Sequence, residues 1–355
     1  MAKIRVLIVD DSALMRQVLA ALLSKDSEIE VIGSAPDPYI AREKIKALNP
    51  DVITLDVEMP KMDGLTFLEK LMRGRPMPVV MVSSLTEVGC QTTLRALELG
   101  AVDFIAKPKI DLREGMEEIA QELIDKIKAA AVANVKRQAL GVRRETNPLT
   151  PYPLPLTSGG AMIKTTDTII AIGSSTGGTE AVKDVLMVLP PNTPPILITQ
   201  HMPEHFTKTW ADRMNSLCRI SVKEAEDGDS VLPGHALVAP GSYHMTLVRS
   251  GARYTVRINQ DPPVNRHRPS VDVMFASVAQ YAGANAVGVI LTGMGGDGSR
   301  EMLTMKRAGA FTIAQDEASC VVFGMPKEAI KLGGVDKILP LSEIPAAIVG
   351  YVSKL

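Results

Sequence analysis

The sequence predicts an α/β protein with two doubly wound parallel-sheet domains, and three observations carry this prediction. Its 355 residues exceed one ordinary domain of ~150 residues. Short apolar runs rich in β-branched residues alternate with amphipathic segments, which is typical of parallel strands joined by crossover helices. This alternation occurs twice, and a stretch rich in proline and basic residues lies between the two occurrences.

The first alternating pattern covers residues 3–125, which we expect to form a flavodoxin-like domain. Its amphipathic segments have helix-like spacing, and its apolar runs are short enough to be buried strands. The expected strands are 4–9, 30–35, 51–55, 79–83 and 102–106, and the expected helices include 13–24 and 90–100.

The character of the chain changes after Lys128. Residues 129–165 contain five basic residues and one acidic residue, Glu145, and the segment NPLTPYPLPLTSGG holds four prolines. Proline removes backbone donors and favours extended conformers. We therefore expect residues 126–165 to contain the end of a helix followed by a basic, proline-rich linker.

A second alternating pattern begins at Thr168, so we expect residues 166–355 to form the second domain. Several of its apolar runs lack polar alternation, as is typical of strands buried on both faces. The expected buried strands are 168–173, 195–199, 286–292 and 310–314, and a small antiparallel excursion is expected from 235–239, 244–248 and 254–258.

Composition argues against several classes of protein. There are 39 basic and 40 acidic residues, a net charge of −1, which argues against nucleic acid or an anionic membrane as the main partner. No apolar run approaches the ~18 residues of a membrane span. Cys90, Cys218 and Cys320 show no CxxC spacing. We expect a cytoplasmic protein that does not insert into a membrane and has no structural disulfide.

Polar side chains follow four of the expected strands in the first domain. Asp10 and Asp11 come directly after the first strand, and Asp56 follows the third. The carboxyl ends of parallel strands converge on one crevice, so these carboxylates repel one another unless they share a cation such as Mg²⁺. Ser83 ends the fourth strand and Lys107 follows the fifth, and both suit stabilisation of phosphoryl oxygens at the same edge.

Each of these residues also has a simpler interpretation. A pair of aspartates at a helix start is often a cap that complements the helix dipole. Asp56 in LDVEMPKMDG also suits a turn, and a lysine such as Lys107 is usually solvated. Five separate elements at the ends of four strands nevertheless favour one shared site.

This set resembles the response-regulator receiver domain over residues 3–125. The resemblance implies that a histidine kinase supplies a phosphoryl group and that Mg²⁺ supports the transfer. It assigns Asp56 as the phosphoacceptor, Asp10, Asp11, Asp56 and the backbone carbonyl of Glu58 as metal ligands, and Ser83, Phe104 and Lys107 as the switch residues that respond to the phosphoryl group.

The second domain places a serine-rich loop, a histidine and an aspartate after three expected strands. The loop in TIIAIGSSTGGTEAV suits either a phosphate at a helix N-terminus or a nucleophilic hydroxyl. It matches no GxGxxG, P-loop or GxSxG pattern, so composition alone leaves it a generic turn. His201 in ITQHMP can accept a hydroxyl proton near neutral pH. Asp297 in LTGMGGDG can orient that histidine, and backbone N–H groups of the same loop can face an oxyanion.

Other candidate side chains of this domain are interpreted as structural. His201 and His205 have the i,i+4 spacing of a zinc site, but Pro203 lies between them and no acidic third ligand has the required spacing. The remaining interpretations are His235 and His244 as surface or packing residues, Cys320 as a core thiol and Trp210 as a helix residue packed on the core.

Five motifs together resemble the catalytic domain of the CheB family of chemotaxis protein-glutamate methylesterases: GSSTGGTEA, ITQHMP, PPVNRHRPSVD, LTGMGGDG and EASCVVFGMP. The match covers most of residues 165–355, and the order receiver, linker, esterase is the architecture of that family. The resemblance implies that Ser175 is the nucleophile, His201 the general base and Asp297 its orienting carboxylate. It also implies that the backbone N–H of Met294 is the oxyanion donor.

The resemblance further implies a phosphorylation-activated serine hydrolase that needs no cofactor for the ester reaction. Its substrates would be glutamate methyl esters, and specific glutamines, on the cytoplasmic helices of chemoreceptors. The alternative is a phosphorylation-controlled receptor-binding module with an inactive hydrolase domain. Arg266, His267 and Arg268 precede an expected helix opened by Ser270, and their simpler role is helix entry and local ion pairing. We also hypothesise that some of these three face a glutamate-rich receptor helix, and that the unphosphorylated receiver blocks Ser175.

Overall fold

The structure is a computed structural model that describes residues 2–60, 62–108, 116–133, 168–251 and 253–354. The chain divides into two units, Met1–Thr150 and Pro151–Leu355, and each is described by itself. The proline-rich part of the expected linker falls outside the described residues, so the domain boundaries drawn from the sequence stay predictions.

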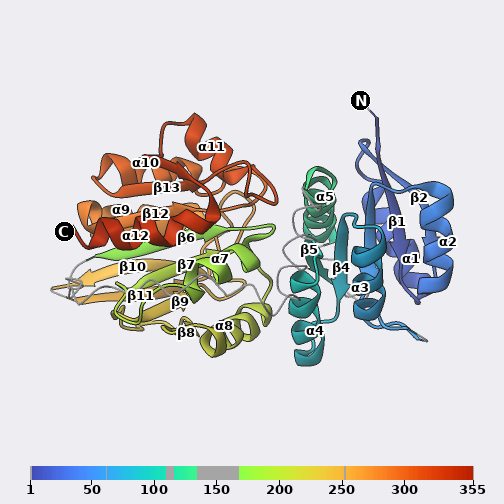
Figure 1. Ribbon diagram of the computed structural model, residues 1–355, viewed down its shortest axis with the longest axis horizontal. Coiled ribbons are helices and arrows are strands. Elements are labelled where there is room, and N and C mark those ends of the chain that lie inside the picture. The colour runs from blue at the N-terminus through green and yellow to red at the C-terminus, as the bar shows by residue number, and fades with distance from the viewer. Residues whose placement is uncertain (1, 61, 109–115, 134–167, 252, 355) are drawn as a thin grey trace. The chain divides into compact units, whose positions relative to one another are not determined.

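The first unit is a five-stranded parallel sheet in the order β2-β1-β3-β4-β5 (Figure 1). Every residue of β3 and β4 is buried, because helices cover both faces of the sheet. The strand order reverses between β1 and β3, which places a crevice at their carboxyl ends. The elements are β1 (Ile4–Val9), α1 (Ala13–Leu23), β2 (Ile29–Ala35), α2 (Pro38–Leu48), β3 (Val52–Asp56), α3 (Gly64–Gly74), β4 (Val79–Ser83), α4 (Glu87–Glu98), β5 (Asp103–Ala106) and α5 (Met116–Val132).

The helices of this unit begin at side-chain caps that the sequence supplies. A hydroxyl or carboxylate before each of the first four helices accepts a hydrogen bond from a backbone N–H of the first turn, which satisfies a donor that the helix cannot pair. The capping residues are Ser12, Asp37, Asp63 and Thr86. All five strands predicted from the sequence are confirmed to within one residue at each end.

The second unit is a seven-stranded parallel sheet in the order β14-β13-β12-β6-β7-β9-β8, with a separate antiparallel pair, β10 and β11 (Figure 1). The chain runs outward from β6 through β7 and then returns to β12 on the other side, so the order reverses between β6 and β12. The strands are β6 (Ile169–Ser174), β7 (Ile196–Gln200), β8 (Ser221–Glu224), β9 (His235–Val238), β10 (His244–Ser250), β11 (Arg253–Asn259), β12 (Ala286–Ile290), β13 (Phe311–Gln315) and β14 (Lys337–Leu339).

Helices flank this sheet and supply much of its core. Trp210 is 2% exposed on α8, which confirms that it packs on the core. Met274 and Phe275 of α9 are fully buried against the sheet. The helices are α7 (Gly178–Met187), α8 (Phe206–Leu217), α9 (Val271–Tyr281), α10 (Ser299–Arg307), α11 (Met325–Lys331) and α12 (Ile344–Val352), with short 3-10 turns at Gly283–Asn285 and Leu341–Glu343.

One assignment within this unit is wrong. The run 235–239 was expected in the antiparallel excursion, but β9 pairs in parallel with both β7 and β8. Ala236, Leu237 and Val238 are consecutive and buried, which is the pattern of a strand covered on both faces. Only β10 and β11 form the antiparallel pair.

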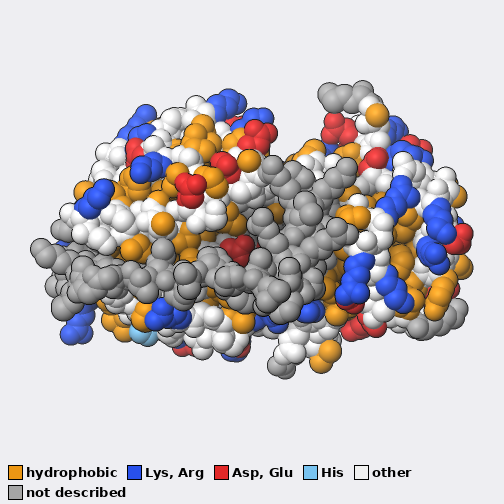
Figure 2. All heavy atoms as spheres, viewed as in Figure 1, with side chains coloured by type: hydrophobic (Ala, Val, Ile, Leu, Met, Phe, Trp, Pro, Cys, Tyr) orange, Lys and Arg blue, Asp and Glu red, His pale blue; other side chains and the backbone are white. Residues whose placement is uncertain are grey.

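The surface carries charges of both signs. On the face drawn in Figure 2, basic and acidic side chains are both present on each unit, in keeping with the net charge of −1. No helix in the described part of the chain has the length and apolar character needed to cross a bilayer.

The close packing of α9 on the sheet can be tested by substituting Gly173 in β6. A Cβ at this position would overlap Val271 Cγ1 and lie 3.2 Å from Phe275 Cζ, so Gly173→Ala should destabilise the second unit by ~1–3 kcal/mol. Urea unfolding followed by the fluorescence of the single tryptophan, Trp210, reports on this unit alone. Gly350→Ala on α12 is the matched control, because its Cβ would meet open space. Equal midpoints for the two variants would contradict the packing argument.

Candidate functional sites

Three carboxylates gather at the crevice of the first unit. Asp10 and Asp11 follow β1 and Asp56 ends β3, and each offers a ligand atom within 4.8 Å of the others. Asp10 and Asp56 are fully buried, whereas Asp11 is exposed. The sequence prediction that these side chains converge is therefore correct for all three.

Lys107 lies among these carboxylates. Its Nζ is 2.8 Å from Asp56 Oδ2 and 3.9 Å from Asp10 Oδ2. Burial, together with the charge of Asp56, raises the pKa of Asp10 to about 6. Burial also raises the pKa of Asp56, and the hydrogen bond from Lys107 opposes that rise. The single ammonium group of Lys107 therefore does not neutralise the negative charge of the three carboxylates.

The donor set fits a hard divalent cation. Asp10 Oδ2 is buried and has no hydrogen-bond partner among the described residues. An orphaned carboxylate oxygen beside two further carboxylates is the ligand type that Mg²⁺ prefers. Glu58 lies next to this group, since its backbone N–H donates to Asp56 Oδ1 at 3.1 Å.

Ser83 and Phe104 belong to the same unit, but the interactions of their side chains lead to neighbouring helices. Ser83 Oγ accepts a hydrogen bond from Thr93 Oγ1 at 2.6 Å and lies 3.3 Å from the carbonyl of Gly89, both on α4. Phe104 is buried, and Lys126 Nζ of α5 lies 5.0 Å from the centre of its ring. Both side chains thus connect the sheet end to α4 and α5.

A serine, a histidine and an aspartate meet at the crevice of the second unit. Ser175 follows β6, His201 follows β7, and Asp297 lies on the loop between β12 and α10. His201 Nδ1 is 3.2 Å from Ser175 Oγ, and His201 Nε2 is 2.8 Å from Asp297 Oδ2. The three side chains form one continuous hydrogen-bonded chain from hydroxyl to carboxylate.

The ring orientation determines which nitrogen accepts the proton. With Asp297 ionised, Nε2 of His201 donates to the carboxylate, which leaves Nδ1 as the acceptor for the Ser175 hydroxyl. The tautomer is inferred from these partners. A hydroxyl within reach of an imidazole that is itself oriented by a carboxylate is the arrangement of an activated nucleophile.

Asp297 is the most heavily hydrogen-bonded group of the site. Its oxygens accept from His201 Nε2, Asn265 Nδ2, Ser270 Oγ and the backbone N–H groups of Val271 and Asp272. Burial by itself raises the pKa of Asp297, but the hydrogen bond and the charge of His201, together with the hydrogen bonds from Asn265 and Ser270, outweigh it and hold the pKa well below its usual range. The carboxylate is thus kept ionised although it is only 2% exposed.

The backbone around Ser175 is held by a buried amide and two close-packed glycines. Gln200 Nε2 donates to the carbonyls of Ser175 at 2.9 Å and His201 at 3.1 Å, and its Oε1 accepts from Ser174 Oγ at 2.6 Å. A Cβ on Gly178 would overlap the Gln200 side chain. A Cβ on Gly293 would lie 2.8 Å from Ser175 Cβ, so the chain segment leading into Met294 passes directly beside the serine.

Four side chains at this site received no catalytic role in the sequence interpretation. They are Gln200, Asn265, His267 and Ser270. The His267 ring stacks on the His201 ring with centroids 3.8 Å apart and an interplanar angle of 17°. Three of the four lie in the motif PPVNRHRPSVD, which was therefore the part of the sequence that could have indicated them. Which of its polar side chains point into the site depends on the turn that the motif forms.

The structural interpretations of the other candidates agree with the structure. Cys320 is buried, and burial raises the pKa of its thiol to about 12, which keeps it from acting as a thiolate. His244 is buried and accepts from the Ser270 backbone N–H at 3.2 Å, whereas His205 is exposed at the start of α8. Arg268 donates to the carbonyl of Gln260 at 3.0 Å, so its guanidinium is held within its own loop.

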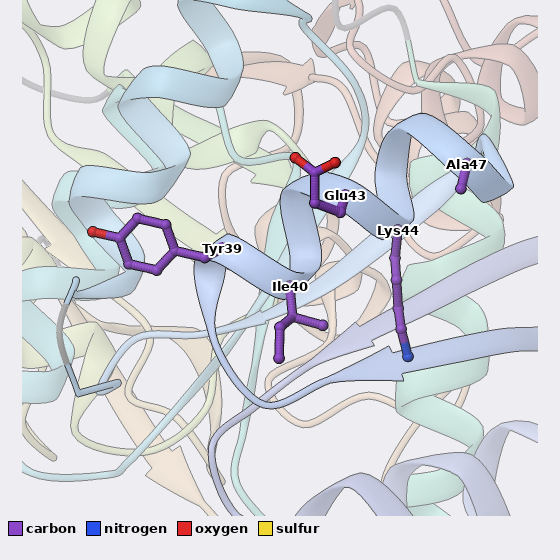
Figure 3. Close-up of a pocket in the computed structure, with 5 residues that line it drawn as sticks. All are labelled: Tyr39, Ile40, Glu43, Lys44 and Ala47. Carbon is purple, nitrogen blue, oxygen red and sulfur yellow. The ribbon is translucent and has the colours of Figure 1, made fainter.

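A shallow depression also lies along α2 (Figure 3). It is lined by Tyr39, Ile40, Glu43, Lys44 and Ala47, all from that one helix. Lys44 reaches the carbonyl of Ser34 on β2. Glu43 supplies a carboxylate, but the lining contains no serine, cysteine or histidine to act with it, so we do not regard the depression as the functional site.

Comparisons with known proteins match a family to each of the two units. Residues 170–348 match the family model of the CheB methylesterase, and residues 6–120 match that of the response regulator receiver domain. A protein-glutamate methylesterase/protein-glutamine glutaminase of Geobacter metallireducens is 60% identical over 98% of this chain and 96% of its own. One of Salmonella typhimurium is 57% identical over 99% of this chain and 98% of its own. The crystal structure of the Thermotoga maritima CheB methylesterase catalytic domain, 39% identical, covers 52% of this chain and 98% of its own with a TM-score of 0.51.

The raised pKa of Asp10 leads to a prediction about stability. An Asp whose folded pKa lies above its ordinary value of 3.8 favours folding at low pH, and this contribution is lost as the pH rises through about 6. Without divalent cations, Asp10→Asn should therefore stabilise the first unit at pH 8 by on the order of 2 kcal/mol, and the gain should shrink towards pH 4.

Urea unfolding monitored by circular dichroism in EDTA, repeated with Mg²⁺, measures this effect. Mg²⁺ should stabilise the wild type more than the Asp10→Asn variant. Glu30→Gln, at an exposed position on β2, serves as the control for loss of one negative charge. A gain for Asp10→Asn that does not change with pH would refute the explanation by burial and charge repulsion.

Proposed function

The chain belongs to the CheB methylesterase family and carries a response-regulator receiver domain, and from that premise we propose that it is a phosphorylation-activated serine hydrolase of chemotaxis. It hydrolyses glutamate methyl esters on chemoreceptors and deamidates specific receptor glutamines. The observation that carries this proposal is the hydrogen-bonded chain from Ser175 through His201 to Asp297.

The geometry accounts for acyl transfer. As Ser175 Oγ attacks the ester carbonyl of a methylated glutamate, Nδ1 of His201 takes its proton, and the resulting imidazolium is stabilised by Asp297. The carbonyl oxygen becomes an oxyanion, for which the backbone N–H of Met294 is the proposed donor. His201 then returns the proton to the departing methoxide, so that methanol leaves.

Water completes the reaction. It attacks the acyl–Ser175 ester with His201 again accepting a proton, and the products are a glutamate carboxylate and free serine. With a glutamine substrate the same attack releases ammonia in place of methanol. The residues of this site need no cofactor for either reaction.

In the first unit we assign Asp56 as the phosphoacceptor, with a histidine kinase as the source of the phosphoryl group. Mg²⁺ held by Asp10, Asp11, Asp56 and the backbone carbonyl of Glu58 would supply charge neutralisation for the incoming phosphoryl group. Lys107 is already within 2.8 Å of Asp56 and is placed to pair with a phosphoryl oxygen. Ser83 and Phe104 are the proposed switch residues, because their contacts lead to α4 and α5.

The substrate partners follow from this chemistry. We assign the cytoplasmic helices of chemoreceptors as substrates, which places the protein in the cytoplasm, and neither nucleic acid nor direct membrane insertion has a role. For receptor contact we retain Arg266, which is exposed at the turn that places His267 beside His201.

An inactive hydrolase domain that only binds receptors is the alternative. The intact hydrogen-bonded triad and the network that keeps Asp297 ionised argue against it. A binding module has no need of an imidazole held between a hydroxyl and a buried carboxylate.

We expect Ser175→Ala to lower methanol release from methylated chemoreceptor membranes at least ~10³-fold, because it removes the nucleophile. Ser174→Ala is the matched control for the adjacent serine. Its hydroxyl donates to Gln200 at 2.6 Å and lies in the supporting network, so we expect a loss of less than ~10-fold. Equal losses in the two variants would contradict the assignment of Ser175 as the nucleophile and of Ser174 as a residue that only supports the site. A wild type that releases no methanol would refute the hydrolase proposal.

A small phosphodonor with Mg²⁺ should raise methanol release by the wild type and leave Asp56→Asn unstimulated. Asp63→Asn provides the same change of charge in the same unit, and asparagine retains the ability to cap α3, so its stimulation should equal that of the wild type. Stimulation that persists in Asp56→Asn would show that the phosphoryl group acts elsewhere.

A further inference from the structure

The motif PPVNRHRPSVD forms a tight turn over the proposed catalytic pair. The backbone N–H groups of Val264 and His267 each donate to the carbonyl of the other, at 3.1 and 2.9 Å. The two residues between them, Asn265 and Arg266, have φ of 52° and 68°. Positive φ at both central positions defines the mirror-image turn that favours asparagine at its first central position.

This turn directs the Asn265 amide at two carboxylates. Its single Nδ2 atom donates to Asp297 Oδ1 at 2.7 Å and to Asp272 Oδ2 at 2.7 Å. Asp297 is 2% exposed and Asp272 is 6% exposed, so water screens repulsion between these two carboxylates only weakly. An amide NH₂ has two hydrogens, and here each carboxylate receives one of them.

The surroundings of Asp272 hold it in place. Its Oδ1 accepts the backbone N–H of Glu301 on α10 at 3.2 Å, while its own backbone lies in the first turn of α9. Burial and the charge of Asp297 raise the pKa of Asp272. Asp272 is thus held close to Asp297, and the Asn265 amide lies between the two carboxylates.

We propose that Asn265 is a positioning residue for the hydrolase reaction: its amide bridges Asp297 to Asp272, cancels their repulsion, and leaves Asp297 Oδ2 directed at His201. The proposal rests on the proposed function. The same turn places the His267 ring 3.8 Å from the His201 ring, so one exposed loop contacts both the base and its carboxylate. Asn265 touches no reacting atom and acts through Asp297.

The test separates loss of the amide from loss of the turn. Asn265→Gly removes the side chain but retains a residue that adopts positive φ without strain. We expect it to lower kcat for methanol release ~10–100-fold with KM unchanged, because it removes a charge-assisted hydrogen bond that orients the base. Asn265→Asp, which puts a third carboxylate at the bridge, should lose more. Asn259→Gly, at the other end of the same loop, is the control and should retain the kcat of the wild type.

A double-mutant cycle tests the bridge itself. If the amide acts by separating two charges, the loss caused by Asn265→Gly should shrink to less than ~3-fold in an Asp272→Asn background. Labelling of Ser175 by a fluorophosphonate should follow the same pattern, and this readout does not depend on the receptor substrate. Trp210 fluorescence unfolding verifies that each variant is folded.

Several outcomes would overturn the inference. Equal losses in the two backgrounds would assign Asn265 a purely structural role, and a raised KM at constant kcat would make it a substrate contact. If the wild type reacts with the fluorophosphonate but releases no methanol, the proposed substrate is wrong, while the labelling cycle still decides the role of Asn265.

Discussion

The buried carboxylate of Asp297 at the N-terminus of α9 is the group on which the catalytic unit depends. The first N–H groups of a helix need acceptors, and the N-cap residue of α9, Ser270, makes no cap of its own. Instead, Asp297 accepts from the N–H groups of Val271 and Asp272 and from the Ser270 hydroxyl. The helix dipole then favours the ionised carboxylate. The carboxylate that orients His201 therefore also fixes the loop after β12 to the start of α9 through these hydrogen bonds.

The two units use the same sheet geometry for opposite purposes. In each, acidic side chains follow strands at the point where the strand order reverses. In the first unit Asp10 Oδ2 has no hydrogen-bond partner among the described residues, and burial together with the charge of Asp56 raises the pKa of Asp10 to about 6. In the second unit donors surround Asp297 and hold its pKa low. A cluster of carboxylates suits a cation, which can then neutralise the charge of a phosphoryl group. A carboxylate whose oxygens are all hydrogen-bonded suits the orientation of a base.

Local sequence patterns predicted the strands that carry the sites, because buried parallel strands are continuous apolar runs followed by polar residues. They did not predict the edge strands β8 and β14, which are short and only partly buried. They misassigned β9, whose partners β7 and β8 are set by crossovers rather than by neighbouring sequence. The roles of Asn265 and Gln200 were not predicted for a related reason, because they depend on hydrogen bonds to residues from other elements of the fold.

The number of hydrogen-bond donors around Asp297 also determines whether this carboxylate stays ionised and in place when His201 is protonated. When His201 becomes an imidazolium, a carboxylate with free lone pairs could rotate or take the proton. Here four donors besides His201 occupy Asp297, including Asn265 and the Ser270 hydroxyl. A carboxylate so occupied remains ionised and cannot reorient, and its stabilising field is in place before Ser175 reacts. The hydrogen bonds that build the start of α9 thus also prepare the base.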